Sequence, residues 1–224
     1  MGDMRHAVSM SLLPMLLVAV LAAAQSSGPP HLRPVQFNGD VDKLRVGALL
    51  VSKPELNDPN FNHTVVVIVQ YDEDKGTYGL IVNRRGTASL DQVLPKVKNA
   101  SSHLVYEGGP VQTDLMQAMF RSRVKPDNSE PVVGDVYETA NSDAIEKMAG
   151  ASGPQRFHAY IGYCGWSGGQ LENEIQMGAW AVLKPDAGVV FDDDPDSLWQ
   201  RLDRQAQMRI ARVFAPIAPY DLSR

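Results

Sequence analysis

Apolar runs separated by turn-forming residues predict a sheet that begins near residue 46. Val46–Val51 is a short apolar run, and Thr64–Tyr71 is rich in β-branched residues and apolar at consecutive positions. A strand that is apolar on both faces is buried on both faces, so we expect Thr64–Tyr71 to lie at the centre of the sheet. Residues 72–76 are typical of a hairpin loop, from which Tyr78–Val82 returns as the partner strand.

Further patterns predict additional strands and several helices. Other apolar or alternating stretches indicate strands at Leu104–Tyr106, 115–121, 132–138, Phe157–Tyr163, Val182 and Val189–Phe191. Helix starts are indicated by capping residues, namely Ser89 with Gln92, Asn141, Ser167 with Gln170, and Asp194 followed by Pro195. Strands outnumber helices, and hairpins mix with strand–helix units. The sequence therefore predicts an α+β fold, with a mixed sheet or partly closed β-barrel flanked by helices.

The first 24 residues differ in kind from the rest of the chain. An apolar stretch from Ser11 to Ala24 follows Arg5 and ends in three alanines, the small-residue pattern that signal peptidase accepts. It is too short to span about 30 Å of hydrocarbon. We expect residues 1–24 to be a signal peptide, residues 25–45 a flexible linker and residues 46–224 a single domain, exported to the periplasm or secreted. The alternatives are a cytoplasmic protein and one tethered to the membrane by an uncleaved signal.

The formal net charge of −5 disfavours nucleic acid as a partner, because an acidic protein repels the phosphate backbone. Cys164 is the only cysteine, which excludes an internal disulfide. The acidic run Asp192–Asp196 lacks the alternate ligand spacing of a calcium loop, and acidic residues are expected at a helix start. The sequence therefore predicts no metal site and no cofactor.

Four segments, in their order and spacing, resemble the YqgE/AlgH family of bacterial proteins. They are Leu49–Asn62 leading into Thr64–Val67, Gly79–Arg84, Glu107–Val111, and Gly162–Ile175 with Trp180 behind it. The resemblance covers about residues 46–202 and implies a mixed α+β fold built on a barrel-like sheet. It implies no settled activity, since the description of the family as a transcriptional regulator arose from effects on exopolysaccharide synthesis. An export signal, Arg85 in place of a common Pro, and Cys164 in place of a small residue depart from the family pattern.

Cys164 is the candidate nucleophile. The segment Gly162–Trp166 places it at a predicted strand-to-helix turn, where a helix N-terminus lowers a thiol pKa and offers backbone donors to an oxyanion. His63, His103 and His158 are candidate bases, although none has a telling spacing. The opposing interpretation is a small, buried residue of the core, which is the more usual role of a single cysteine.

Two groups of residues are candidates for binding a ligand or a partner. They are Asn83, Arg84, Glu107, Gly108 and Gly109 in the first group, and Gly165, Trp166, Gln170 and Glu174 in the second. If the loops of the first group meet, Arg84 and Glu107 bracket a polar ligand or partner. The amides that follow Ser167 offer an anion site at a helix start. In the opposing interpretation, Asn83 only ends a strand, Arg84 pairs with a surface acid, and Trp166 is a core aromatic residue.

Three hypotheses for the function follow. The leading one is a non-catalytic binding or regulatory protein that acts through an unidentified protein partner or a small polar ligand. The second is a cysteine-dependent hydrolase or transferase that uses Cys164. The third, which rests on the family description alone, is a transcriptional regulator, and it conflicts with the acidic charge and the absence of a recognisable DNA-binding motif in the sequence.

Overall fold

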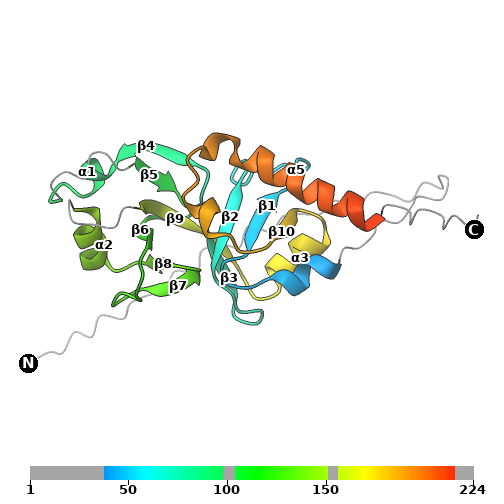
Figure 1. Cartoon of the computed structure of the whole chain (residues 1–224), viewed down its shortest axis with the longest axis horizontal. Helices are drawn as coiled ribbons and strands as arrows, with labels where there is room; N and C mark the ends of the chain where they lie inside the picture. The colour runs from blue at the N-terminus through cyan, green and yellow to red at the C-terminus, as the bar shows by residue number, and fades with distance from the viewer. Residues whose placement is uncertain (1–37, 98–103, 151–155, 215–224) are drawn as a thin grey trace, which may run out of the picture. The chain divides into compact units, whose positions relative to one another are not determined.

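In the part of the chain that the computed structural model describes, residues 38–97, 104–150 and 156–214, ten strands form one strongly curled half-barrel sheet (Figure 1). Eight of them follow the order β10 (Trp180–Leu183), β1 (Leu49–Ser52), β2 (Val65–Gln70), β3 (Thr77–Ile81), β9 (Phe157–Trp166), β6 (Val111–Arg121), β8 (Val136–Thr139) and β7 (Glu130–Val133). β4 (Arg85–Ser89) pairs with β5 (Leu104–Glu107). β5 pairs with β9 in parallel, whereas the remaining pairs are antiparallel, so the sheet is mixed as predicted.

Consecutive residues of β2 face two different hydrophobic cores. Val65 and Val67 belong to the core that contains Leu198 of helix α5 (Pro195–Phe214). Val66 and Ile68 belong to the core that contains Leu171 of helix α3 (Gln170–Gln176). Because both faces of the strand are covered, every residue from Val65 to Val69 is apolar. The predicted central strand is confirmed.

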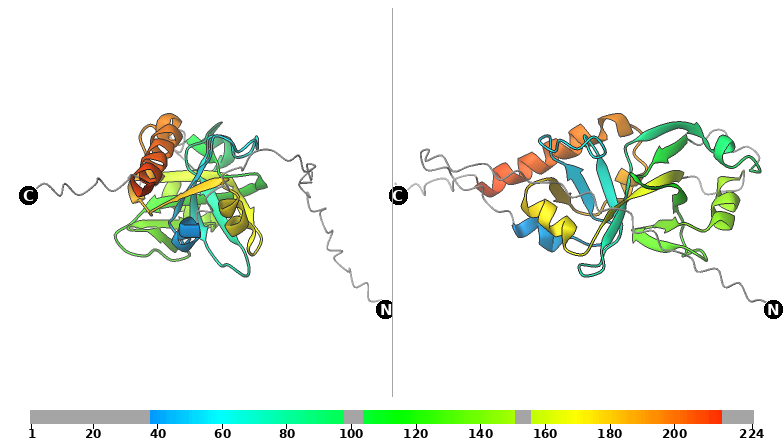
Figure 2. Two further views of the ribbon diagram at one scale, coloured as in Figure 1. Left: turned by 90° about the vertical axis from the view of Figure 1, so that its right-hand side faces the viewer. Right: turned by 180° about the vertical axis from the view of Figure 1, so that it is seen from behind.

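The helices lie on both faces of the sheet (Figures 1 and 2). α5 runs across β1 and β10, while α3 and the 3-10 helix η1 (Asn38–Lys43) lie together on the other face. α1 (Leu90–Val93) and α2 (Ser142–Ala149) cover β5, β6 and β9, and α4 (Ala187–Val190) contributes to the core under α5. None of the helices in the described ranges is both long enough and apolar enough to cross a membrane.

The predicted helix starts are local features, and three of the four are confirmed. The side chain of Asn141 accepts a hydrogen bond of 2.9 Å from Ala144 N–H at the start of α2. The Ser89 N–H donates to the Gln92 side chain at 3.0 Å at the start of α1. α5 begins at Pro195 directly after Asp194. The predicted signal peptide and His103 lie outside the described residues.

Two strand predictions were wrong, and one strand was not predicted. Residues 132–138 are not one strand, because Gly134 has φ of +59° and turns the chain between β7 and β8. Val189–Phe191 is not a strand either, since Val189 and Val190 lie in α4, whose first turn is capped by the Asp186 side chain. Strand β4 has no apolar run to mark it, and the sequence analysis missed it. These errors arise where a turn residue or a tertiary pairing outweighs the local apolar pattern.

Strand β9 is longer than predicted and continues through Cys164 to Trp166. The prediction that Ser167 is the cap of the next helix was therefore wrong. The helix begins at Gln170, and Gly169, with φ of +71°, is its N-cap. The Gln170 side chain still accepts a hydrogen bond from Ser167 N–H at 3.1 Å, so the capping-box spacing predicted a real contact, although Ser167 lies three residues before the first residue of the helix.

Candidate functional site

Arg84 and Glu107 lie side by side in the wall of a cavity of about 400 Å³, called the Arg84 cavity below. The Glu107 N–H donates to the Arg84 carbonyl at 3.0 Å, next to the ladder pair Arg85 and Tyr106. Residues that face each other across two strands project on the same side. Asn60, Thr87 and Thr113 add further polar side chains to the lining. The structure thus brings together two loops that are 23 residues apart in the chain.

The Arg84 guanidinium is half-buried, and it forms neither a hydrogen bond nor an ion pair with any described residue. The neighbouring Arg85 differs, because it lies 3.8 Å from the Asp196 carboxylate and donates to the Asp193 carbonyl at 3.4 Å. The Glu107 carboxylate is exposed and has no ion pair within the described ranges. The cavity therefore presents one uncompensated cation beside one uncompensated anion. A guanidinium has the fork geometry that binds a carboxylate or a phosphate.

The other members of the first group shape the cavity. The Asn83 side chain accepts from Val65 N–H at 2.8 Å and donates to the His63 carbonyl at 2.9 Å, which ties the end of β3 to the start of β2. A Cβ on Gly108 would lie 2.3 Å from the Gly162 carbonyl oxygen, so only glycine lets the loop after β5 cross β9 at this distance. Gly109 lines the cavity. Asn83 and Gly108 are therefore structural, while Arg84, Glu107 and Gly109 face the cavity.

The second group surrounds a carboxylate. The Trp166 and Trp180 indole N–H groups both donate to Glu174 Oε2, at 3.0 and 2.9 Å. Gln170 Nε2 donates to Glu174 Oε1 at 3.0 Å, and the Phe61 ring packs against both indoles. This network joins β9, β10 and α3. It identifies Gln170 and Glu174 as residues that hold these elements together.

The start of α3 does not offer an anion site. The Gly169 N–H donates to the Glu73 carbonyl at 3.0 Å, and the Gln170 N–H donates to the Ser167 carbonyl at 3.0 Å. Gly165 and Trp166 instead line a second cleft, with Tyr78, Gln117 and Tyr163. This cleft shares no lining residue with the Arg84 cavity, so the two candidate groups do not form one site.

Cys164 lies inside strand β9 and is fully buried, not at a strand-to-helix turn as predicted. Its thiol donates to the Gly108 carbonyl at 3.4 Å, and no described histidine is hydrogen-bonded to it. Burial raises the pKa of the thiol well above its ordinary value, and the charge of Arg84 only partly opposes this effect. A buried thiol that holds its proton at neutral pH is not a nucleophile.

Two carboxylates of the acidic run before α5 form ion pairs with arginines. Asp192 pairs with Arg201 at 2.6 Å, and Asp193 pairs with Arg156 at 2.8 Å. The hydrogen bond from Arg156 lowers the pKa of Asp193. Within the described ranges, no cluster of three or more His, Cys, Asp or Glu side chains is arranged to hold a metal ion.

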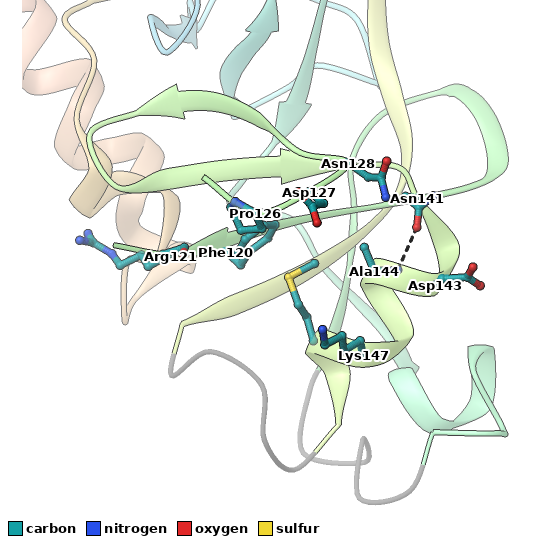
Figure 3. Close-up of a pocket in the computed structure, with 11 residues that line it drawn as sticks. Phe120, Arg121, Pro126, Asp127, Asn128, Asn141, Asp143, Ala144 and Lys147 are labelled. Carbon is teal, nitrogen blue, oxygen red and sulfur yellow. Dashed lines mark hydrogen bonds between the residues drawn. The ribbon is translucent and has the colours of Figure 1, made fainter. Parts of the chain in front are cut away.

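A third hollow, of about 480 Å³, lies between the end of β6 and helix α2 (Figure 3). Two of its polar side chains already have partners within the protein. Asn141 caps α2, and Arg121 pairs with Asp135 at 2.9 Å and donates to the Ala187 carbonyl at 3.0 Å. In Figure 3 the Arg121 side chain points away from α2. We therefore regard the Arg84 cavity as the stronger candidate site.

Comparisons with known proteins agree with the fold and the sequence motifs. The family described as AlgH-like (DUF179) matches residues 49–211. A UPF0301 protein of Thioalkalivibrio sulfidiphilus is 35% identical over 156 residues, which cover 67% of this chain and 83% of the relative. A UPF0301 protein of Caulobacter vibrioides is 34% identical over 173 residues, covering 74% and 88%.

Two solved structures are also similar to this chain. The solution structure of the AlgH protein from Pseudomonas aeruginosa has a TM-score of 0.60 and 28% identity, and the match covers 87% of this chain and 98% of that one. The crystal structure of a protein from Corynebacterium diphtheriae has a TM-score of 0.59 at 22% identity, covering 71% and 86%, and supports the fold alone.

Proposed function

This chain belongs to the AlgH-like family, and we propose that it is a non-catalytic binding protein whose Arg84 cavity takes a small polar ligand with a carboxylate group. The observation that carries the proposal is the Arg84 guanidinium, a half-buried cation without a partner among the described residues. A partly buried charged side chain that forms no ion pair is able to bind a ligand of opposite charge through charge-assisted hydrogen bonds, which are stronger than neutral ones.

Glu107 restricts the charge of the ligand. The backbone of Glu107 lies next to that of Arg84, so a carboxylate at this position disfavours a dianion such as phosphate and favours an ammonium group. A small zwitterion satisfies both residues, with its carboxylate on Arg84 and its ammonium on Glu107. Asn60 and Thr113 offer neutral hydrogen-bonding groups to the remainder of the ligand.

Two-dimensional amide NMR titrations with glycine, acetate and ethylammonium test this proposal. We expect glycine to bind more tightly than either singly charged probe. Arg84→Gln should weaken glycine about tenfold or more, since hydrogen bonds to charged groups contribute about 1.5–3 kcal/mol. Arg85→Gln is the matched control, because Arg85 faces the acidic run instead of the cavity, and it should leave the affinity unchanged. Equal weakening by both variants, or no saturable shift with glycine, would refute the proposal.

We propose in addition that the mature protein acts outside the cytoplasm, as the apolar leader of the sequence suggests. The test is the mass of the protein purified from fractionated cells of its native host. A mass that corresponds to a chain beginning near Gln25, in the extracytoplasmic fraction, would support export. A full-length protein in the cytosol would contradict it and would reopen the hypothesis of a transcriptional regulator.

A further inference from the structure

Two buried polar groups lie without partners on the neighbouring strands β6 and β8. Gln117 is 2% exposed and Glu138 is 5% exposed. Gln117 Nε2, a donor, and Glu138 Oε1, an acceptor, form no hydrogen bond within the described part of the chain. Because an unpaired buried polar group costs free energy, a fold retains such groups only where something compensates for them.

The register of the sheet places the two side chains next to each other. Met119 of β6 pairs with Glu138 of β8, and Gln117 lies two residues from Met119 on the same face. Gln117 and Glu138 are thus diagonal neighbours, with their Cβ atoms about 7–8 Å apart. They are not hydrogen-bonded to each other. A single small group between them is able to contact both.

Gln117 also lies at the base of the second cleft, which has a volume of about 610 Å³ and is called the Gln117 cleft below. Tyr78 and Tyr163 form one wall, with ring centroids 5.7 Å apart and the rings edge to face. Burial raises the pKa of Tyr78 well above its ordinary value, and the nearby charge of Glu138 raises it further. Glu138 is not itself a lining residue of the cleft, but Ala140, two residues further along the chain, is one. Aliphatic and aromatic side chains share the lining with polar ones, among them Gln70, Thr77 and Gln112. A concave site that combines apolar surface with polar groups is a candidate small-molecule site.

We propose that the Gln117 cleft binds a small neutral ligand through a hydroxyl or a primary carboxamide, which accepts from Gln117 Nε2 and donates to Glu138 Oε1. Either group both accepts and donates, and so satisfies the two orphan atoms at once. A carboxylate only accepts and is repelled by Glu138. An ammonium only donates, and leaves Gln117 unpaired. The apolar part of the ligand packs on the rings of Tyr78 and Tyr163.

Matched aromatic probes test the proposal by two-dimensional amide NMR. Benzamide and phenol carry the required group, toluene lacks it, and benzoate has the shape of benzamide with a negative charge. The reporter is the side-chain amide of Gln117, identified by the signals that disappear in Gln117→Leu. We expect saturable shifts of these signals with benzamide and phenol. The affinities for toluene and benzoate should be lower by about tenfold or more.

Variants locate the binding and separate this site from the Arg84 cavity. Glu138→Leu should weaken benzamide about tenfold, whereas Glu138→Gln should keep it, because an amide also accepts and donates. Arg84→Gln, in the other cavity, should leave the affinity unchanged. If the protein binds benzamide in the Gln117 cleft but does not bind glycine, this proposal is supported and the proposed function of the Arg84 cavity is refuted.

Two results would overturn the proposal. One is the absence of saturable shifts with both benzamide and phenol. The other is binding that persists unchanged in Glu138→Leu. If in addition the double variant Gln117→Leu/Glu138→Leu is at least as stable as the natural protein, the two side chains form a polar pair bridged only by water. The dispersion of the amide spectrum shows whether each variant is folded.

Discussion

Ionisation of Glu138 should lower the stability of the folded protein as the pH rises. Burial and, to a smaller extent, the charge of Glu130 raise the pKa of this carboxyl from 4.5 to about 7. No lysine or arginine of the described chain pairs with Glu138. Between these two pKa values the folded state holds a proton that the unfolded chain has lost. The contribution of the protonated Glu138 carboxyl to the stability is therefore fully present below about pH 4.5 and is lost as the pH rises through about 7.

The size of the effect follows from the two pKa values. At about 1.4 kcal/mol for each tenfold change in proton affinity, a change from 4.5 to about 7 corresponds to about 3 kcal/mol. Glu138 is 5% exposed, so solvent screens little of this energy. For a folded unit of this size, a loss of about 3 kcal/mol lowers the melting temperature by roughly 6–12 °C.

Urea denaturation at a series of pH values measures the effect. The informative quantity is the difference in unfolding free energy between the natural protein and Glu138→Gln, because the contributions of the other ionisable groups cancel in this difference. This difference should move in favour of Glu138→Gln by about 3 kcal/mol between about pH 4.5 and about pH 8.5. Glu55→Gln, at an exposed position, should show no such trend. If the curves of the natural protein and Glu138→Gln run parallel, Glu138 ionises as in water and the burial argument is wrong.

Three further predictions concern the frame of the sheet. Glu174→Ala should lower the unfolding free energy by about 2–4 kcal/mol, because it leaves the Trp166 and Trp180 indole N–H groups without their acceptor, and Glu174→Gln should lose less; urea denaturation followed by tryptophan fluorescence measures both. Cys164 should react with iodoacetamide at neutral pH only after unfolding, because its thiol is buried and its pKa is raised; rapid labelling of the native protein, read by mass spectrometry, would contradict the structure. Gly162→Ala should destabilise far more than Gly169→Ala, since both residues have φ near +70° but only at Gly162 would a Cβ meet another atom, the Gly109 carbonyl oxygen at 2.4 Å; similar melting temperatures for the two variants would show that the backbone adjusts at Gly162.

The parts of the fold that sequence predicts correctly depend on local chemistry or on continuous burial. β2 is recognisable because both of its faces are covered, which leaves no polar position from Val65 to Val69. The starts of α2 and α5 are recognisable because a cap requires only residues within one turn. By contrast, β4 is held by its pairing with β5 and carries no apolar pattern of its own, so its sequence contains no sign of a strand.

The candidate sites illustrate the same limit. Arg84 and Glu107 were selected as residues of two loops, but their adjacency depends on strands that lie between them in the chain. The sequence analysis missed Gln117 and Glu138 altogether. A signal was available, since each polar residue interrupts a stretch that otherwise reads as a buried strand. Whether such a residue turns inward or outward is decided by register, which a single sequence does not contain.

Because β9 pairs with three other strands, the sheet cannot be completed during synthesis until β9 is present. β9 pairs with β3, β5 and β6, and all three precede it in the chain. Until residue 166 has left the ribosome, those strands each keep an edge with unpaired backbone groups, which is the surface that chaperones bind and that aggregation uses. A nascent chain that stops before β9 therefore has separate pieces, β1–β2–β3, β4–β5 and β6–β8–β7, instead of one sheet. Folding of this protein should depend on holding those edges apart until β9 has been synthesised.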